Sequence, residues 1–331
     1  MALSMMRRAP VQAHPSSPAA RCKKFRHVVV QYRSKDQGGR DEKGDVVLYT
    51  ATDPVHGGMC PYSQAVIMAL LEKKVPFREV KVRAAALSLQ PSSGSDSRPQ
   101  VDLGAKPQEF VELYHSIIPD RGERERVPVL LNGTNRLVDS TTIVEYLAAA
   151  YPESGTALMP PDAYTAARVK LFSRYFADHV VPAYHHLVGV SEPAMIEEAK
   201  KELMGALACV DEFLALHGAG EGEYAVGPHY GWSMSSQGGE EGASAKPHEH
   251  FLMGPFYTTA EVLATPYVAR MVQVLPEWRG LDVLAECEGR KLARVAGWMR
   301  ACLGRPSAQL TGPRKQELVD GLVQWEWSHA V

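Results

Sequence analysis

The run Asp45-Val46-Val47-Leu48-Tyr49-Thr50, followed ten residues later by Cys60-Pro61-Tyr62-Ser63-Gln64-Ala65-Val66-Ile67, decides the fold of this chain. The first run is rich in β-branched and aromatic residues and predicts a strand, and turn-forming residues fill the gap between the two. Pro61 is typical of the first position of a helix, and apolar residues then recur at helical spacing from Ile67 to Leu71, up to Pro76. The sequence therefore predicts a strand, a loop and a helix that begins directly after a cysteine.

Strands and helices continue to alternate after Pro76. Phe77–Val82 reads as a second strand, and 106–114 as a short helix. The run Val127-Pro128-Val129-Leu130-Leu131 is followed by Asn132-Gly133 and Arg136-Leu137-Val138, which predicts a hairpin because Asn-Gly favours tight turns. Ser140 is expected to cap the next helix. These alternating elements predict an α/β domain.

A second unit begins after Tyr151-Pro152, which ends the preceding helix, and near Met159-Pro160-Pro161. From there the pattern is helical. Phe172, Phe176 and Val180 are spaced by four, and a second stripe with helical spacing runs from Leu203 to Leu214. We expect these residues to pack inside an all-helical domain.

Length and composition set limits on function. The chain has 331 residues, 45% of them hydrophobic and 22% charged, and this length suits two domains. Its formal net charge of −2 offers no electrostatic argument for a nucleic acid partner. No apolar run is long enough to span a bilayer, so no stable membrane insertion is expected. The five cysteines are widely spaced and suit free thiols in the cytoplasm; no metal site is predicted.

The first 35 residues are basic and contain no acidic residue before Asp36. Such a composition is typical of a transit peptide for a mitochondrion or plastid, and equally of a disordered basic extension. The segment from His27 to Tyr32 looks more like a short strand than a leader. Cytoplasmic location is the first expectation, and organelle targeting is the alternative.

Cys60 and Ser63 are the predicted catalytic residues. A thiol reacts as its thiolate, and the free N–H groups and dipole at a helix start stabilise that anion, lowering the pKa to roughly 3.5 to 7.5 in related sites. Ser63 stands where a dithiol oxidoreductase has its second cysteine. Since Ser63 cannot resolve a mixed disulfide, the second thiol must come from solution, and glutathione is the candidate. Ser63 can donate a hydrogen bond to the sulfur. The alternative for Cys60 is a small buried hydrophobic residue.

Four runs around this cysteine carry a resemblance to a known family: Asp53-Pro54, Gly57-Gly58, Cys60-Pro61-Tyr62-Ser63-Gln64 and Leu71-Glu72-Lys73-Lys74-Val75-Pro76-Phe77. They resemble the cysteine-type glutathione transferases, most closely the dehydroascorbate reductases and then the omega and lambda classes. They are also similar to chloride intracellular channel proteins. The resemblance implies a thioredoxin-like α/β N-terminal domain and an all-α C-terminal domain, with glutathione as cosubstrate. Pro61 and Tyr62 then belong to the glutathione site.

The resemblance also assigns residues on the hairpin to glutathione. It implies that Pro128 is a cis proline that leaves the Val127 backbone free to pair with the cysteinyl part of glutathione. Asp139-Ser140 matches the pair that holds the γ-glutamyl group, Ser140 at its carboxylate and Asp139 at its ammonium. Taken alone, Val-Pro also suits the start of an edge strand, and Asp-Ser a helix cap.

The predicted division of the chain has four parts and two insertions: 1–44 basic extension, 45–152 thioredoxin-like domain with an insertion at about 84–105, 153–312 helical domain with an insertion at about 217–250, and 313–331 tail. In the helical domain, Thr258 and Glu261 have the spacing of a capping box. Leu303-Gly304-Arg305-Pro306-Ser307 resembles the end of a transferase helix.

The expected function is a glutathione-dependent thiol transferase that forms a mixed disulfide at Cys60 and acts on a small disulfide, a glutathionylated thiol or dehydroascorbate. Met59 and Ala65 depart from the pattern of dehydroascorbate reductases, which weakens that substrate more than the thiol chemistry. The candidates for the glycyl carboxylate are His115, Arg124 and Arg126. A monomer and a homodimer are both compatible with the sequence.

Three other functions remain open. One is conventional transfer of glutathione to electrophiles, with Tyr49 or Tyr62 stabilising the glutathione thiolate. A second is a membrane-inserting protein like the chloride intracellular channels. A third is an interaction module without catalysis.

Overall fold

The computed structural model describes residues 29–32, 46–51, 59–82, 106–120, 122, 124–217 and 251–329. The predictions for most of the basic extension, for the glycine-rich loop before Met59, and for both insertions lie outside these residues. The division into domains therefore remains a prediction at its insertions and at the N-terminus.

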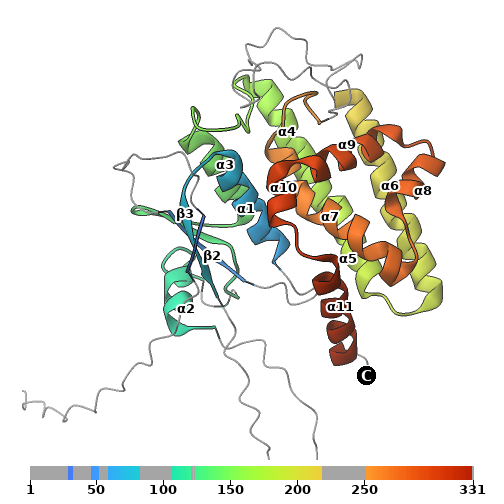
Figure 1. Ribbon diagram of the computed structural model, residues 1–331, viewed down its shortest axis with the longest axis horizontal. Coiled ribbons are helices and arrows are strands. Elements are labelled where there is room, and N and C mark those ends of the chain that lie inside the picture. The colour runs from blue at the N-terminus through green and yellow to red at the C-terminus, as the bar shows by residue number, and fades with distance from the viewer. Residues whose placement is uncertain are drawn as a thin grey trace, which may run out of the picture.

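A five-stranded mixed sheet forms the N-terminal half (Figure 1), in the order β1-β3-β2-β4-β5. β2 (Val46–Thr50) and β3 (Phe77–Lys81) are parallel, as expected for two strands joined through a helix. β4 (Val129–Asn132) and β5 (Asn135–Val138) form the predicted hairpin. β1 (Val29–Tyr32) pairs antiparallel with β3, so part of the basic extension joins the sheet.

Helices cover both faces of this sheet, and the alternation of side chains along each strand explains which face each helix takes. Leu48 and Leu130 pack into the core formed with α1 (Pro61–Glu72) and α3 (Ser140–Ala150). Val129, one residue from Leu130, points to the opposite face and packs with α2 (Gln108–His115). Figure 1 shows α1 between the sheet and the helices of the second half. The thioredoxin-like fold predicted from the sequence is confirmed.

The second half contains helices and no strand in the part that the structure describes, with two isolated β-bridges within residues 251–256 before α7. The helices are α4 (Ala163–Tyr175), η1 (Phe176–Val180), α5 (Val181–Gly189), α6 (Pro193–His217), α7 (Thr259–Arg279), α8 (Val283–Gly289), α9 (Ala293–Gly304), α10 (Pro306–Thr311) and α11 (Lys315–His329). The predicted stripe Phe172, Phe176 and Val180 is buried, although it crosses from α4 into the π-helical turn η1. Residues 313–331, predicted as a tail, contain α11, which packs on α7.

The predicted capping box at the start of α7 is present and lies in the core. Glu261 accepts hydrogen bonds from the backbone N–H groups of Thr258 (2.9 Å) and Leu252 (2.8 Å), and from the indole N–H of Trp298 (3.1 Å). Burial raises the pKa of Glu261, and these donors oppose that rise. The box therefore fixes the helix start to the segment before it.

A polar cluster connects the end of α1 to the helical half. The Glu72 carboxylate binds the Arg305 guanidinium at two points, 3.0 and 2.8 Å, and accepts from the hydroxyls of Ser307 (2.6 Å) and Thr156 (2.7 Å). Gly155 (φ 60°) lies against the Glu72 carbonyl, where a Cβ would come within 2.0 Å of the oxygen. The two halves are thus joined through buried hydrogen bonds as well as apolar contact.

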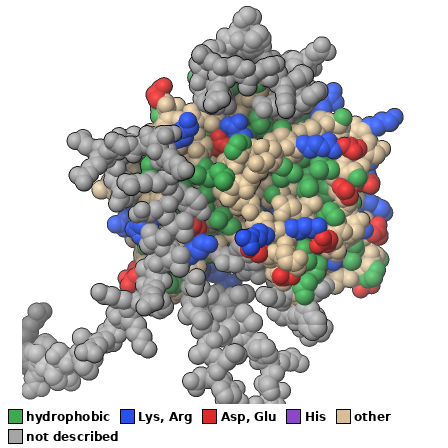
Figure 2. Space-filling model, in the orientation of Figure 1, with side chains coloured by type: hydrophobic (Ala, Val, Ile, Leu, Met, Phe, Trp, Pro, Cys, Tyr) green, Lys and Arg blue, Asp and Glu red, His purple; other side chains and the backbone are tan. Residues whose placement is uncertain are grey.

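The surface in Figure 2 mixes Lys and Arg with Asp and Glu over the helical half, in keeping with the small net charge. Among the described helices, none has both the length and the apolar composition that a membrane span requires. Within the same residues, no group of three or more metal-binding side chains comes together.

Candidate functional site

Cys60 occupies the N-cap position of α1 (φ −57°, ψ 130°) and is 8% exposed. Its N–H donates to the Ala51 carbonyl after β2 (3.1 Å), and its carbonyl accepts from the N–H of Gln64 (2.9 Å). Pro61 follows at the first helical position, as predicted. The thiol therefore sits where free N–H groups and the helix dipole favour its thiolate.

Ser63 lies on the first turn of α1 and is completely buried. Its hydroxyl makes no hydrogen bond to any residue that the structure describes. The predicted hydrogen bond from Ser63 to the Cys60 sulfur is not formed in this arrangement, so a catalytic part for Ser63 stays a prediction.

The peptide bond between Val127 and Pro128 is cis, as the resemblance implied. β4 begins directly after it, with Val129 opposite Tyr49 of β2. This pairing puts the start of β4 beside the end of β2, directly before Ala51, whose carbonyl accepts from the N–H of Cys60. The strand pairing therefore brings the cis-proline segment and the cysteine to the same edge of the sheet.

Asp139 and Ser140 lie at the start of α3, and Asp139 is the N-cap in place of the predicted Ser140. Asp139 is the N-cap, since its side chain accepts from the N–H of Thr142 (2.8 Å), and Ser140 is the first helical residue, 6% exposed. The prediction that Ser140 caps the helix is wrong because the turn from β5 puts Asp139 at φ 71°, outside the helix. Such a strained backbone at an exposed Asp is more frequent at functional sites.

A cleft between the two halves gathers several of the predicted residues. It encloses about 90 Å³ and is lined from the sheet side by α1 and α3, and from the helical side by α4, η1, α5 and α7. Every side chain that lines it is uncharged. These residues are Pro61, Tyr62, Ala65, Ser140, Thr141, Ser173, Phe176, Ala177, Val181, Ala260, Leu263, Ala264 and Tyr267. The predicted residues Pro61, Tyr62 and Ser140 are thus brought together in the cleft, while Cys60, directly before Pro61, is not among its lining residues.

Two residues of α7 were not found from the sequence: Tyr267 lines this cleft, and Arg270 lies behind it against the start of α1. Tyr267, 4% exposed, meets the half-exposed Tyr62 edge to face at 5.9 Å. Burial raises the pKa of Tyr267, with smaller effects from Tyr62 and Cys60, so its hydroxyl stays protonated. Arg270 is completely buried and donates to the Met59 carbonyl and to the Gln64 side chain. The signal for Arg270 was available, because it is the only charged residue between Glu261 and Glu277.

Two other candidates from the sequence are engaged elsewhere. Tyr49 packs against Phe110 of α2, 5.9 Å between ring centroids, on the sheet face away from α1. His115 is held through both ring nitrogens, by the Glu125 carboxylate (3.0 Å) and the Ile118 carbonyl (3.2 Å). Arg124 and Arg126 remain exposed on the loop before β4.

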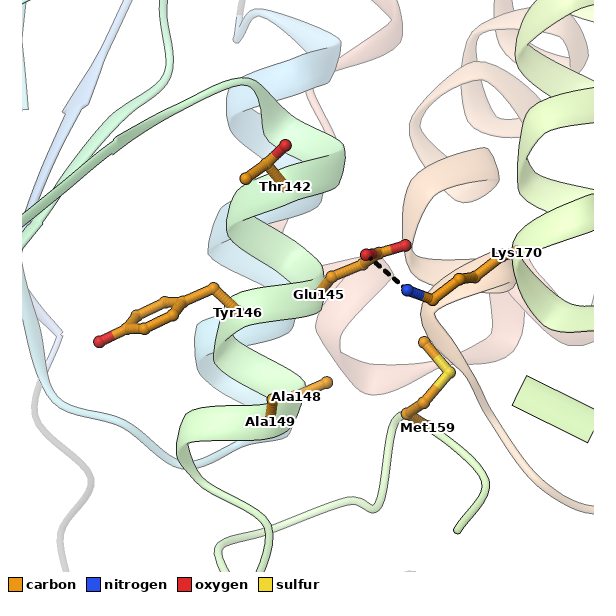
Figure 3. Close-up of a pocket in the computed structure, with 7 residues that line it drawn as sticks. All are labelled: Thr142, Glu145, Tyr146, Ala148, Ala149, Met159 and Lys170. Atoms are coloured by element: carbon orange, nitrogen blue, oxygen red, sulfur yellow. Dashed lines mark hydrogen bonds and ion pairs between the residues drawn. The ribbon is translucent and has the colours of Figure 1, made fainter. Parts of the chain in front are cut away.

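A second hollow lies on the other flank of α3 (Figure 3), and no predicted site residue lines it. Glu145 of α3 and Lys170 of α4 reach toward each other across it and form an ion pair at 2.8 Å, while Tyr146 points away. Both charged side chains are partly exposed. Of the two hollows described, only the cleft beside α1 is therefore lined by predicted site residues.

The family match to known proteins falls in the N-terminal half of the chain. Residues 59–150 match the family model described as Glutathione S-transferase, N-terminal domain. The fold is that of the glutathione transferase superfamily. Glutathione S-transferase U13 from Arabidopsis thaliana is 28% identical over 107 residues, 32% of this chain and 47% of the relative. The chain thus spans about half the length of the curated relatives that it matches.

Solved glutathione transferases share the architecture over most of both chains. Glutathione transferase Omega 3C from Trametes versicolor aligns with 82% of this chain and 90% of its own, at 20% identity and a TM-score of 0.54. Rice GST1, solved in complex with glutathione, aligns with 86% of this chain and 99% of its own, at 18% identity and a TM-score of 0.57. At these identities the likeness concerns the fold.

Proposed function

We propose that this protein is a glutathione-dependent thiol transferase whose nucleophile is Cys60. The observation that carries the proposal is the position of Cys60 at the N-cap of α1, directly before Pro61 of the interdomain cleft. The cis Val127–Pro128 bond directly precedes β4, which pairs with β2. Ser63 occupies the position of a resolving cysteine, so the cycle needs a thiol from solution.

The chemistry proceeds in two exchanges. The Cys60 thiolate attacks the glutathione sulfur of a mixed disulfide between glutathione and a substrate thiol; their S–S bond breaks and the substrate leaves as a thiolate that takes a proton. The thiolate of a second glutathione then attacks the Cys60-bound sulfur, which releases oxidised glutathione and restores Cys60. The uncharged walls of the cleft favour neutral, partly apolar substrates over charged ones. Dehydroascorbate remains one candidate among small oxidised substrates.

The residues around Cys60 suit an extended glutathione molecule. The Val127 backbone beside the cis peptide offers polar groups to its cysteinyl part, as an edge strand does to a peptide. At the start of α3, Ser140 and the helix N-terminus favour its α-carboxylate, and the Asp139 side chain can meet its ammonium. Pro61 and Tyr62 line the same space.

Intact mass after incubation with oxidised glutathione tests the proposal. We expect one glutathione on the wild-type protein, mapped to Cys60, and none at that position in Cys60→Ser. Cys209 is the matched control because it is also a free thiol and is exposed, so Cys209→Ser should keep the adduct and the activity in a hydroxyethyl disulfide assay. Full activity of Cys60→Ser in that assay would exclude the mechanism.

A second candidate is conventional transfer of glutathione to an electrophile. It is favoured by the Tyr62 hydroxyl at the cleft and by relatives whose names are those of glutathione S-transferases. Here Cys60 is dispensable and the hydroxyl stabilises the glutathione thiolate. Conjugation of chlorodinitrobenzene that survives in Cys60→Ser and is lost in Tyr62→Phe would support this candidate; the opposite pattern supports the thiol transferase.

A further inference from the structure

Arg270 is a charged residue in an otherwise uncharged stretch of α7 and is completely buried. Burying a guanidinium without compensation is costly, so buried arginines are held by hydrogen bonds or opposite charges. The groups that Arg270 contacts therefore indicate the function of its positive charge.

Its guanidinium spans the start of α1. Nη2 donates to the carbonyl of Met59, the residue directly before Cys60, in a very close contact. Nη1 donates to Oε1 of Gln64 (2.9 Å) and to the Pro266 carbonyl one turn back on α7 (2.9 Å). The positive charge is thus fixed to the backbone on one side of Cys60 and to a side chain in the first turn after it.

Other ionisable groups belong to the described elements around Cys60. α1 contributes Tyr62, and α7 contributes Tyr267, whose pKa burial raises. The sheet contributes Glu79, which is buried and accepts a hydrogen bond from Thr50 (2.6 Å), the residue before Ala51. The raised pKa of Tyr267 keeps its hydroxyl neutral at physiological pH. Arg270 is the cation among these groups, and it is bonded to the carbonyl of the residue directly before Cys60.

Hydrogen bonds that join α1 to the helical half do not need a charged donor at this position. Gln64 also donates to the Thr311 hydroxyl (3.3 Å), which is a neutral link between α1 and α10. The Glu72 cluster joins α1 to the same part of the chain independently of Arg270. Charge matters where an anion must be stabilised in a medium of low dielectric constant. The anion that forms at this end of α1 is the Cys60 thiolate.

We propose that Arg270 is a positioning residue whose charge, held at the Met59 carbonyl and Gln64, stabilises the Cys60 thiolate from the helical domain. The inference rests on Cys60 being the nucleophile of the proposed function. It makes the reactivity of the cysteine depend on the packing of α7 against α1, in addition to the helix dipole.

The test measures the thiolate directly, without glutathione. Alkylation of the whole protein by iodoacetamide is followed from pH 4 to 10, and the Cys60 peptide is quantified by mass spectrometry. In Arg270→Met, we expect the apparent pKa of Cys60 to rise by about one unit or more, as for loss of a nearby opposite charge. Below both pKa values, one unit makes alkylation about tenfold slower. Arg270→Lys keeps a charge and should recover most of the wild-type profile.

Three controls separate this effect from lost stability. Arg168→Met removes another buried arginine of the helical half and should leave the Cys60 profile unchanged, as should the Cys209 peptide in every variant. If Arg270→Met does not fold, Gln64→Glu cancels the charge with an isosteric carboxylate and should raise the pKa of Cys60 likewise. A folded Arg270→Met or Gln64→Glu protein with an unshifted profile would overturn the inference. Glutathionylation of Cys60 in that same protein would leave the proposed function standing.

Discussion

The Glu72 carboxylate offers the sharpest test of how the two halves are joined, through the substitution Glu72→Ala. The change removes the acceptor of four hydrogen bonds and leaves the Arg305 guanidinium, 20% exposed, without its carboxylate partner. Removing one member of a buried ion pair costs ~3 to 5 kcal/mol. Because Arg305 retains some contact with water, we expect about 3 kcal/mol.

For a folded part of this size, about 3 kcal/mol corresponds to a fall in Tm of roughly 6 to 12 °C. The measurement is thermal and urea unfolding followed by circular dichroism. Glu145→Ala is the control, since its ion pair with Lys170 is partly exposed and should contribute less than ~1 kcal/mol. A loss in Glu72→Ala no larger than that in Glu145→Ala would refute the reasoning.

The same carboxylate predicts a pH dependence. Burial raises the pKa of Glu72, but the hydrogen bonds and charge of Arg305, with Ser307 and Thr156, outweigh it and lower the pKa below its ordinary value. The stabilisation is therefore complete above the pKa of the unfolded chain, about 4.3, and is lost as pH falls through the lower folded value. The difference in unfolding free energy between wild type and Glu72→Gln should shrink below about pH 4. A difference that stays constant down to pH 3 would contradict this assignment.

Four further substitutions test other sites. Gly155→Ala should lower the unfolding free energy by more than ~2 kcal/mol, because Gly155 has a positive φ and a Cβ there would clash with the Glu72 carbonyl. Gly205→Ala, which has open space around it, should instead stabilise α6 by about 0.5 to 1 kcal/mol. Urea titration measures both changes. Asp139→Asn should keep the helix cap and Tm but weaken glutathione binding by calorimetry, and equal affinity would remove Asp139 from the site. Glu261→Ala should lower the unfolding free energy by ~3 kcal/mol or more, since it leaves several buried donors unpaired, and a Tm within 2 °C of wild type would contradict that.

Features with a local cause could be predicted from the sequence. Pro61 after Cys60 specifies a helix start, Asn132-Gly133 a tight turn, and Thr258 with Glu261 a capping box; each depends on residues within a few positions, and the structure has all three. The cis bond before Pro128 was inferred from family resemblance rather than from physics, because the energy difference between isomers is small.

Features that depend on the three-dimensional path of the chain could not be predicted from the sequence. Whether Asp139 or Ser140 caps α3 is decided by the backbone angle at the end of β5, and both residue types are good caps. The contact of Arg270 with the residue before Cys60 joins positions 211 apart in the chain. Only the isolation of Arg270 in an apolar helix indicated that its charge has a use.

The burial of α1 on nearly every side has a consequence for how the protein is made. Its residues Ile67, Met68 and Leu70 are completely inaccessible, and part of that cover comes from α7 and α10, which begin at Thr259 and Pro306. During synthesis the sheet and α1 leave the ribosome long before those helices exist. The reactive cysteine therefore acquires its final environment only when most of the chain has been translated, and a nascent chain stalled before α7 presents an uncovered apolar helix to chaperones.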